Sequence, residues 1–298
     1  MSVSYTSGNI KNVLICGKGE IGSAIGFIAA KRGFTVDYYD PQKGIDPEDR
    51  SDTNFEGYDV IHVCFPIKDV NAIYDVVNKS HMYGVIVIDA TIPVGLAGKI
   101  NDMFKDEGYG QLLLHSPVRG RHPNMVGGLR KYVKFVGPAD STRIQETEDF
   151  CKFYYTQLGI PYKVLSSADA CALGKLTDTT WYLTQIVFAN QISILCAKHN
   201  LNFDEVYTQF QETADTGVKF KNVEGRAICE SFVPRPVMTP GFVGGHCLIP
   251  NLEILKQDIS PSFYSWVKQM NEYFAGNINK MVESNADVKP LEHEGDRE

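Results

Sequence analysis

The strand-like run Asn12-Val-Leu-Ile-Cys16 leads directly into Gly17-Lys-Gly19-Glu-Ile-Gly22, and this stretch decides the fold. The apolar run fits a buried strand, and the G-x-G-x-x-G pattern then opens a helix that we expect over Ile21–Arg32. In such a turn Gly17 permits the tight bend, Gly19 lets the backbone approach a pyrophosphate, and Gly22 allows close packing of helix on strand. The stretch therefore predicts the first βαβ unit of a dinucleotide-binding domain.

The residues around this turn indicate which dinucleotide it would hold. The helix N-terminus, where Glu20 and Ile21 lie, attracts the pyrophosphate anion. Asp40 ends the next expected strand, 40 − 22 = 18 residues after the last glycine. A carboxylate there accepts hydrogen bonds from the ribose hydroxyls and repels a 2′-phosphate, which favours NAD, while Lys43 leaves some room for NADP. The expected cofactor-binding residues are Gly17, Gly19, Glu20, Ile21, Gly22, Asp40 and Thr91.

The first half of the chain continues to alternate apolar runs with helical stretches such as Val70–Ser80. Near-continuous hydrophobicity is typical of parallel strands that are covered on both faces. The alternation predicts an α/β fold in which an N-terminal Rossmann domain, a doubly wound parallel sheet, precedes an all-α domain. The further strands are expected at Phe34–Tyr39, Val60–Phe65, Val85–Ile88, Gln111–His115 and Val133–Val136.

The second half shows helical signals. A long helix with many apolar residues is expected over Asp169–Lys198, and shorter helices over Phe203–Thr213 and Phe263–Glu283. Long apolar helices after a Rossmann domain often build a dimer core, so we expect a homodimer, although the usual role of a single apolar residue is to pack in the core of its own chain. The predicted domains are residues 1–165 for the Rossmann domain, 166–285 for a helical substrate and dimerisation domain, and 286–298 for a flexible tail.

Length and composition describe an ordinary globular chain. The 298 residues are 43% hydrophobic and 22% charged, which excludes a disordered or fibrous protein. A net charge of −7 without a basic stripe argues against a nucleic-acid partner. No apolar run approaches the length of about 18 residues that a membrane span needs. The N-terminus lacks a signal-peptide core and the seven cysteines lack CxxC spacing, so we expect a soluble cytoplasmic protein with reduced thiols and no metal site.

Two of the expected strands end in loops with a distinctive composition. Asp89-Ala-Thr-Ile-Pro-Val94 follows one strand, and His115-Ser-Pro-Val-Arg-Gly-Arg-His122 follows the next. Ligands bind beyond the carboxyl ends of strands in open α/β sheets, so both loops are expected at the nicotinamide end. Thr91 can hydrogen-bond the cofactor or the substrate. Arg119 and Arg121 either pair with a phosphate or carboxylate through bidentate hydrogen bonds or are ordinary surface arginines.

Two residues of the second half are candidates for catalysis. Lys175 lies in an otherwise apolar or small-residue helical stretch. Desolvation suits a lysine to acid–base work near neutral pH, although a lysine in a helix more often reaches solvent. Cys247 ends the loop Thr239-Pro-Gly-Phe-Val-Gly-Gly-His-Cys247. A buried structural cysteine is the usual interpretation, but glycines and a histidine beside the thiol favour a nucleophilic thiolate.

In their order along the chain these motifs resemble the nucleotide-sugar dehydrogenases, which act on UDP-glucose, UDP-N-acetylmannosamine and GDP-mannose. Pro240 to Cys247 carries the most specific part of the resemblance. It implies that Cys247 is a nucleophile that forms a thiohemiacetal and then a thioester. It also implies that Lys175 stabilises developing oxyanions and that Thr91 positions a catalytic water. The expected substrate-binding residues, for a small anionic substrate, are Ser116, Arg119, Arg121, Thr179, Gly244, Gly245 and His246.

The sequence departs from the family pattern at three positions. The family's glutamate after the fifth strand is Val118, its asparagine one turn after the lysine is Thr179, and its aspartate after the cysteine loop is Asn251. The family also has a third, C-terminal domain that holds the nucleotide, and this sequence ends where that domain would start. We expect a partner chain or the dimer to supply that surface if the substrate is a sugar nucleotide.

A second resemblance leaves open whether the reaction passes through a thioester on Cys247 or uses Lys175 alone. Ser116-Pro-Val-Arg-Gly120 is similar to the substrate-carboxylate loop of the β-hydroxyacid dehydrogenases, whose catalytic lysine matches Lys175. The alternative is therefore a single oxidation by a β-hydroxyacid dehydrogenase, or the reaction of an imine reductase, with Lys175 alone. A further alternative is a protein that binds NAD without catalysis.

Overall fold

The computed structural model describes residues 10–45, 57–67, 69–71, 73, 76, 84–120, 123–215, 236–245 and 247–284. The chain forms two compact units that divide between Leu176 and Thr177. No helix among these residues is long and apolar enough to cross a membrane. The expected helix over Val70–Ser80 lies mostly outside the described residues, and the expected tail at 286–298 lies wholly outside them.

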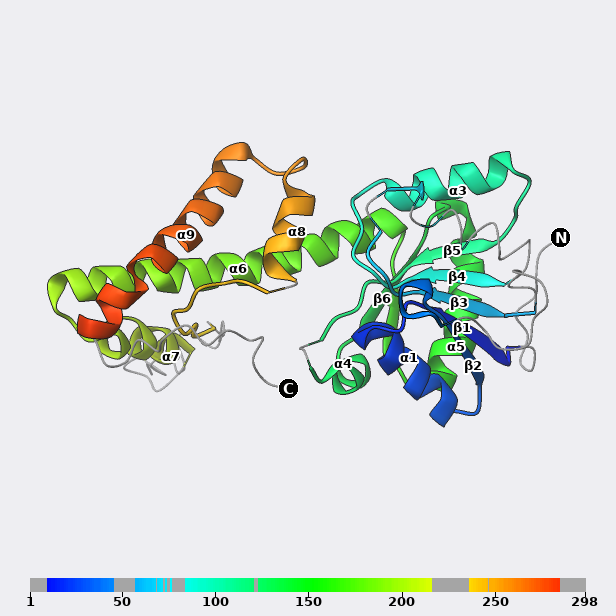
Figure 1. Cartoon of the computed structure of the whole chain (residues 1–298), viewed down its shortest axis with the longest axis horizontal. Coiled ribbons are helices and arrows are strands. Elements are labelled where there is room, and N and C mark those ends of the chain that lie inside the picture. Colours follow the sequence, from blue (N-terminus) through cyan, green and yellow to red (C-terminus); the bar gives the residue numbers. More distant parts are fainter. Residues whose placement is uncertain are drawn as a thin grey trace, which may run out of the picture. The chain divides into compact units, whose positions relative to one another are not determined.

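The first unit is built on a seven-stranded sheet with the order β2-β1-β3-β4-β5-β6-β7 (Figure 1). Strands β1 to β5 are parallel in every pairing. This confirms the Rossmann-type α/β fold and the positions of the predicted strands to within two residues. The strands are β1 (Asn12–Cys16), β2 (Thr35–Tyr39), β3 (Val60–Val63), β4 (Val85–Ile88), β5 (Leu112–His115), β6 (Lys134–Pro138) and β7 (Tyr162–Val164).

The sheet is parallel except at one pairing, where β6 runs antiparallel to β5. The short helix α4 (Met125–Lys131) lies in the connection between these two strands, among the residues that the structure describes. Strand β7 was not predicted. It has three residues with no buried side chain, so it lacks an apolar signal, and it pairs in parallel with β6 at the edge.

Helices cover both faces of the sheet, which explains the continuous hydrophobicity of its strands. Alternate side chains of β1 enter different cores: Val13 and Ile15 pack in one, and Leu14 and Cys16 in the other. The first core includes residues of α1 (Glu20–Lys31), α4 and α5 (Ile144–Leu158), and the second includes residues of α3 (Leu96–Asp106). Figure 1 shows α3 on the opposite side of the sheet from α1, α4 and α5.

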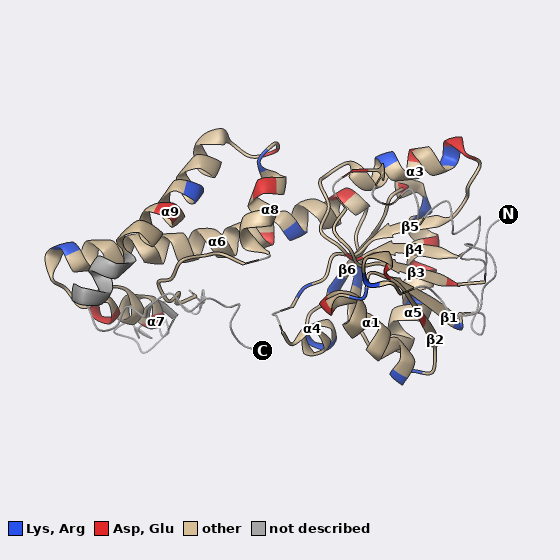
Figure 2. Ribbon diagram, in the orientation of Figure 1, with Lys and Arg blue, Asp and Glu red and all other residues tan. Residues whose placement is uncertain are grey.

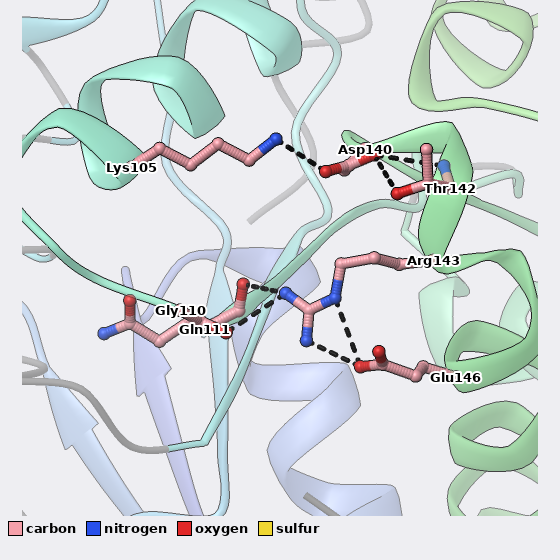
Figure 3. A network of polar contacts seen from close by, with 7 residues as sticks. All are labelled: Lys105, Gly110, Gln111, Asp140, Thr142, Arg143 and Glu146. Atoms are coloured by element: carbon pink, nitrogen blue, oxygen red, sulfur yellow. Dashed lines mark hydrogen bonds and ion pairs between the residues drawn. The ribbon is translucent and has the colours of Figure 1, made fainter. Parts of the chain in front are cut away.

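A surface network joins the end of α3 to the turn before α5, where the 3-10 turn η2 (Ser141–Arg143) lies. Lys105 and Asp140 form an ion pair at 2.6 Å, and the pKa of Asp140 is lowered to about 2 by hydrogen bonds from Lys105 and Thr142. Arg143 donates to the carbonyls of Gly110 and Gln111 and pairs with Glu146 (Figure 3). These contacts hold the loop that enters β5, at the edge of the sheet away from the glycine turn.

The second unit is helical, as predicted. Helix α6 (Ala168–His199) begins in the first unit, where Ala168 and Ala172 pack in the sheet core, so the two units divide within this helix rather than before it. One apolar cluster of the second unit includes Leu183, Val187, Leu252 and Val267. The remaining elements are a π-helical turn η3 (Asp204–Thr208), α7 (Gln209–Asp215), α8 (Leu248–Leu255) and α9 (Pro261–Ser284).

Candidate cofactor and catalytic site

The glycine turn between β1 and α1 has the geometry that its sequence requires. Gly17 has a φ of +96°, a conformation that only glycine adopts without strain. A Cβ on Gly22 would lie 2.0 Å from the Gly17 carbonyl oxygen and 2.8 Å from Ile15 Cγ2, so helix and strand approach closely there. A Cβ on Gly19 would meet no atom within 4 Å. The protein's own packing therefore explains two of the glycines, while Gly19 leaves open space in front of the turn.

The same turn presents a helix N-terminus that can bind an anion. Helix α1 begins at Glu20, and its N-cap residue Gly19 has no side chain to bond the first N–H groups. Such N–H groups, together with the positive end of the helix dipole, bind phosphate. Open space at Gly19 and a helix N-terminus without a side-chain cap fit the pyrophosphate of a dinucleotide, which Gly19, Glu20 and Ile21 would hold.

Asp40 lies at the end of β2 and is tied to the glycine turn. Its Oδ2 accepts a hydrogen bond from the Lys18 N–H at 2.9 Å. Lys43, in the 3-10 turn η1 (Pro41–Lys43), lies with Nζ 3.8 Å from the same oxygen and donates to the Lys18 carbonyl at 2.5 Å. The second carboxylate oxygen, Oδ1, takes part in neither of these contacts. This arrangement fits a ribose ligand at Asp40, and the Lys43 ammonium is drawn toward Asp40.

The sheet order places the glycine turn at the point where the strand order reverses. After β1 the chain moves to β2 on one side and then returns to β3 on the other. Open α/β sheets bind ligands outside the carboxyl ends of the strands at this reversal. A Cβ on Gly17 would lie 3.2 Å from backbone atoms of Cys64 and Phe65, so the end of β3 packs directly against the turn.

The Thr91 loop, residues Asp89–Gly95, follows β4 at the same edge. Thr91 is partly exposed, and its neighbours Ala90 and Ile92 are buried. Gly95 N–H donates to Asp169 Oδ1 at 2.8 Å, which fixes the far end of the loop. The loop therefore presents Thr91 from a backbone that is held on both sides, and its role toward cofactor or water stays a prediction.

The loop after β5 places its predicted residues differently. The Ser116 side chain is fully buried, and its hydroxyl donates to the Phe135 carbonyl at 2.8 Å. The Arg119 guanidinium lies over the rings of Tyr132 and Phe135, at 5.8 and 5.5 Å from their centres. Ser116 thus bonds within the protein, while Arg119 is partly exposed. Arg121 lies outside the described residues.

Lys175 and Cys247 belong to different units. Lys175 is partly exposed on α6, two turns after Ala168, within the first unit. Cys247 is partly exposed and is the N-cap residue of α8 in the second unit. That Lys175 and Cys247 act on the same substrate stays a prediction.

The backbone before Cys247 is held by two asparagines of the second unit. Asn190 of α6 bonds Gly241, and Asn271 of α9 bonds Val243. Gly245 has a φ of +76°, which explains one glycine of the loop. Gly244 is exposed and its added Cβ would meet only the Phe242 ring, so no turn requires it. His246 lies outside the described residues.

The departures from the family pattern are linked in the structure. Asn251 Nδ2 donates to Thr179 Oγ1 at 3.2 Å, and both residues are buried in the second unit. The two substituted positions are therefore hydrogen-bond partners, a pairing that the sequence did not reveal. Val118 is buried and its N–H donates to the Asp89 carbonyl at 3.2 Å. The Val118 side chain therefore provides no carboxylate at the carboxyl ends of the parallel strands.

Sequence reasoning missed a buried polar cluster at the carboxyl edge, formed by His62, Asp89, Lys134 and Tyr154. The signal was present, since a histidine interrupts the apolar run of β3 and a lysine interrupts that of β6. Charged residues are almost never fully buried unless they are paired. Among the residues that the structure describes, no group of His, Cys, Asp and Glu is arranged to hold a metal ion.

The fold is shared with known dehydrogenases. UDP-D-ManNAc dehydrogenase from Pyrococcus horikoshii matches with a TM-score of 0.70 at 20% identity, over 94% of this chain and 73% of that one. UDP-glucose dehydrogenase from Pyrobaculum islandicum matches with a TM-score of 0.65 at 15% identity, over 93% and 72%. The 3-hydroxyisobutyrate dehydrogenase of Mycobacterium tuberculosis, solved with L-serine, matches with a TM-score of 0.58 at 16% identity, over 94% and 96%.

The sequence matches no protein-family model and no curated protein sequence. The structural likeness, in which the glycine turn, the sheet and the long helix follow in the predicted order, confirms the expected resemblance at the level of the fold. The chain has the fold of the sugar-nucleotide dehydrogenases and of 3-hydroxyisobutyrate dehydrogenase.

Proposed function

We propose that this protein is an NAD-dependent dehydrogenase that oxidises a hydroxyl group of a small anionic substrate. The observation that carries the proposal is the glycine turn, where Gly19 leaves open space in front of an uncapped helix N-terminus. Asp40 beside the turn supports NAD rather than NADP, because its carboxylate accepts ribose hydroxyls and repels a 2′-phosphate. Bound NAD supplies the hydride acceptor.

In the proposed first oxidation Lys175 takes the proton of the substrate hydroxyl while the carbon loses a hydride, which gives an aldehyde. Cys247 then adds to the aldehyde carbon and forms a thiohemiacetal. Loss of a second hydride gives a thioester on Cys247, and water placed by Thr91 hydrolyses it to the acid. Each hydride carries two electrons, so the full sequence consumes two molecules of NAD for each substrate.

The position of Cys247 at the N-terminus of α8, on a loop held by two asparagines, supports this covalent route. The sugar-nucleotide dehydrogenases that share the fold suggest a sugar nucleotide as the substrate. Arg119 and Arg121 are proposed to bind the anionic group of the substrate.

The second candidate function is a single oxidation by Lys175, as in a β-hydroxyacid dehydrogenase. It is compatible with the fold that the chain shares with 3-hydroxyisobutyrate dehydrogenase. It is favoured by Val118, which stands where the nucleotide-sugar dehydrogenases have a glutamate. Without that glutamate, thioester hydrolysis lacks its expected acid.

The stoichiometry of NADH formation separates these candidates. Purified enzyme is screened against UDP-sugars, GDP-mannose and β-hydroxyacids, and NADH is counted for each molecule of substrate consumed. Two NADH support the covalent route, and one supports the single oxidation. Lys175→Ala should abolish turnover in both cases, and Lys198→Ala, an exposed lysine of the same helix, is the matched control. Full activity of Cys247→Ala would exclude the covalent route. NAD binding without turnover of any compound would favour a non-catalytic role.

We also propose that α6 forms a homodimer interface. Trp181, Phe188 and Leu195 follow one another at intervals of seven residues and therefore share one helix face, where they are 64%, 50% and 49% exposed. No charged residue occurs from Thr179 to Ala197, and Figure 2 shows this uncharged stretch of α6. Light scattering should give a dimer mass for the wild type and a monomer mass for Phe188→Glu. The control Tyr273→Glu on α9 should remain dimeric.

We also propose that the protein works in the cytoplasm, where cysteine thiols such as that of Cys247 stay reduced.

A further inference from the structure

A chain of buried polar groups crosses the carboxyl edge of the sheet. Asp89, directly after β4, binds Lys134 Nζ through Oδ1 and His62 Nδ1 through Oδ2, each at 2.6 Å. Lys134 Nζ also donates to the Ser116 carbonyl at 2.6 Å, and His62 Nε2 lies 2.8 Å from the Tyr154 hydroxyl. All these side chains are buried. We call this set, His62, Asp89, Lys134 and Tyr154, the edge network.

The hydrogen bonds of the edge network fit one set of protonation states. Burial alone would raise the pKa of Asp89, but Lys134 and His62 hold it below its ordinary value, so Asp89 is ionised. An ionised carboxylate only accepts, so His62 Nδ1 donates to it. Burial raises the pKa of Tyr154 well above its ordinary value, so its hydroxyl keeps the proton and donates to His62 Nε2. Every member then has a partner, with Asp89 and Lys134 cancelling in charge.

The edge network ties together the ends of four neighbouring strands. His62 belongs to β3, Asp89 follows β4, Ser116 follows β5, and Lys134 begins β6. Apolar side chains would fill the same volume without the cost of burying charges, and replacing buried ion pairs by apolar residues often leaves stability unchanged or improved. The directional bonds fix the relative positions of the strand ends, which apolar packing specifies less sharply.

Asp89, a member of the edge network, is also the first residue of the Thr91 loop. His115 Nε2 lies 3.1 Å from the Ala90 carbonyl, and Val118 N–H donates to the Asp89 carbonyl at 3.2 Å. The two residues that precede Thr91 are thus held by the edge network and by the strand beside it. Asp169 holds the loop again at Gly95. Thr91 lies between these fixed points and is partly exposed.

The orientation of a bound dinucleotide brings its reactive half to this loop. Asp40 at the end of β2 would hold the adenosine ribose, and the glycine turn at β1 would hold the pyrophosphate. Because β3 and β4 lie on the other side of β1 from β2, the nicotinamide half extends over the ends of β3 and β4. We infer that the edge network positions the Thr91 loop as the binding surface of the nicotinamide half, an inference that rests on the proposed dinucleotide site.

Ligands that differ only in the nicotinamide test this inference without a known substrate. The dissociation constants of NADH and ADP-ribose are measured by calorimetry for the wild type and for Asp89→Asn/Lys134→Met, which removes both charges together. Tyr154→Phe is a milder variant that removes only the bond to His62. Thr147→Val is the control, because it removes a buried hydrogen bond to Arg143 near the start of α5, away from the edge network. Thermal unfolding identifies the variants that are folded.

The wild type should bind NADH about tenfold more tightly than ADP-ribose. In the double variant this ratio should fall to nearly one, while the dissociation constant of ADP-ribose stays within about twofold of the wild-type value. Tyr154→Phe should give a ratio of the two dissociation constants between those of the wild type and the double variant. Thr147→Val should keep the wild-type ratio. An unchanged ratio in folded edge-network variants, or equal weakening of both ligands, would overturn the inference. A wild type that binds neither ligand would instead overturn the proposed function.

Discussion

Asn190 and Gly241 exchange two hydrogen bonds: Asn190 Nδ2 donates to the Gly241 carbonyl at 2.9 Å, and the Gly241 N–H donates to Asn190 Oδ1 at 2.7 Å. Asn271 repeats the arrangement at Val243, with distances of 2.8 and 3.0 Å. Each buried amide offers a donor and an acceptor, so it pairs with the loop backbone as a neighbouring strand would. The loop that leads to Cys247 is thus held by side chains from two helices.

Asn190→Ala should therefore loosen this loop. The change leaves a backbone N–H and C=O of Gly241 without their partners, which should lower the free energy of unfolding by about 2 kcal/mol. The loosened loop should also expose Cys247, and its alkylation by iodoacetamide, followed by mass spectrometry of the Cys247 peptide, should become faster. Asn277→Ala is the control, since Asn277 bonds only within α9. An unchanged rate of alkylation would mean that Asn190 does not restrain the cysteine.

Gly19→Ala should separate cofactor binding from folding. A Cβ at this position meets no protein atom, so the free energy of unfolding should change by less than about 0.5 kcal/mol. The same Cβ occupies the space proposed for the pyrophosphate, so the dissociation constant of NADH should rise by at least about tenfold. Gly98→Ala on α3, where an added Cβ is also unhindered, should leave binding unchanged. Equal affinity in both variants would place the dinucleotide elsewhere.

Asp40→Asn should weaken the preference for NAD over NADP. The amide oxygen can still accept the hydrogen bond from Lys18, so the turn should keep its shape. Loss of the negative charge removes the repulsion of a 2′-phosphate, and Lys43 lies close enough to attract one. The ratio of the NADPH and NADH dissociation constants should fall by about tenfold. A ratio that stays at the wild-type value would show that Asp40 does not select the cofactor.

His115 should make the fold sensitive to mild acid. Burial lowers its pKa to about 4, although hydrogen bonds to the Ala168 and Ala90 carbonyls oppose the shift. Between the unfolded value of about 6.5 and the folded value, the unfolded chain binds the extra proton, so stability is full above pH 6.5 and decreases as the pH falls toward 4. The decrease should approach about 3 kcal/mol.

Urea unfolding at a series of pH values measures this effect. The carboxylates also titrate below pH 5, so the comparison is with His115→Asn, which keeps a polar side chain but does not titrate. The variant should show a shallower loss of stability between pH 6.5 and 4. Parallel curves for the two proteins would contradict a depressed pKa at His115.

The features that sequence predicts well are those with a local physical cause. The glycine pattern reports a backbone conformation and a close approach, and both occur at Gly17 and Gly22. Strand β7 and the reversal of β6 depend on tertiary pairing, which leaves little mark on composition. The edge network depends on contacts between residues as far apart as His62 and Tyr154. Its signal in the sequence is limited to two polar residues within apolar strands, His62 and Lys134.

A crystal structure of the protein with NAD is the decisive test of the proposed dinucleotide site. We expect a pyrophosphate bound to the N–H groups at the start of α1, a ribose at Asp40, and a nicotinamide ring against Thr91 within reach of Lys175. A dinucleotide bound away from the glycine turn, or a nicotinamide ring that Lys175 cannot approach, would contradict it.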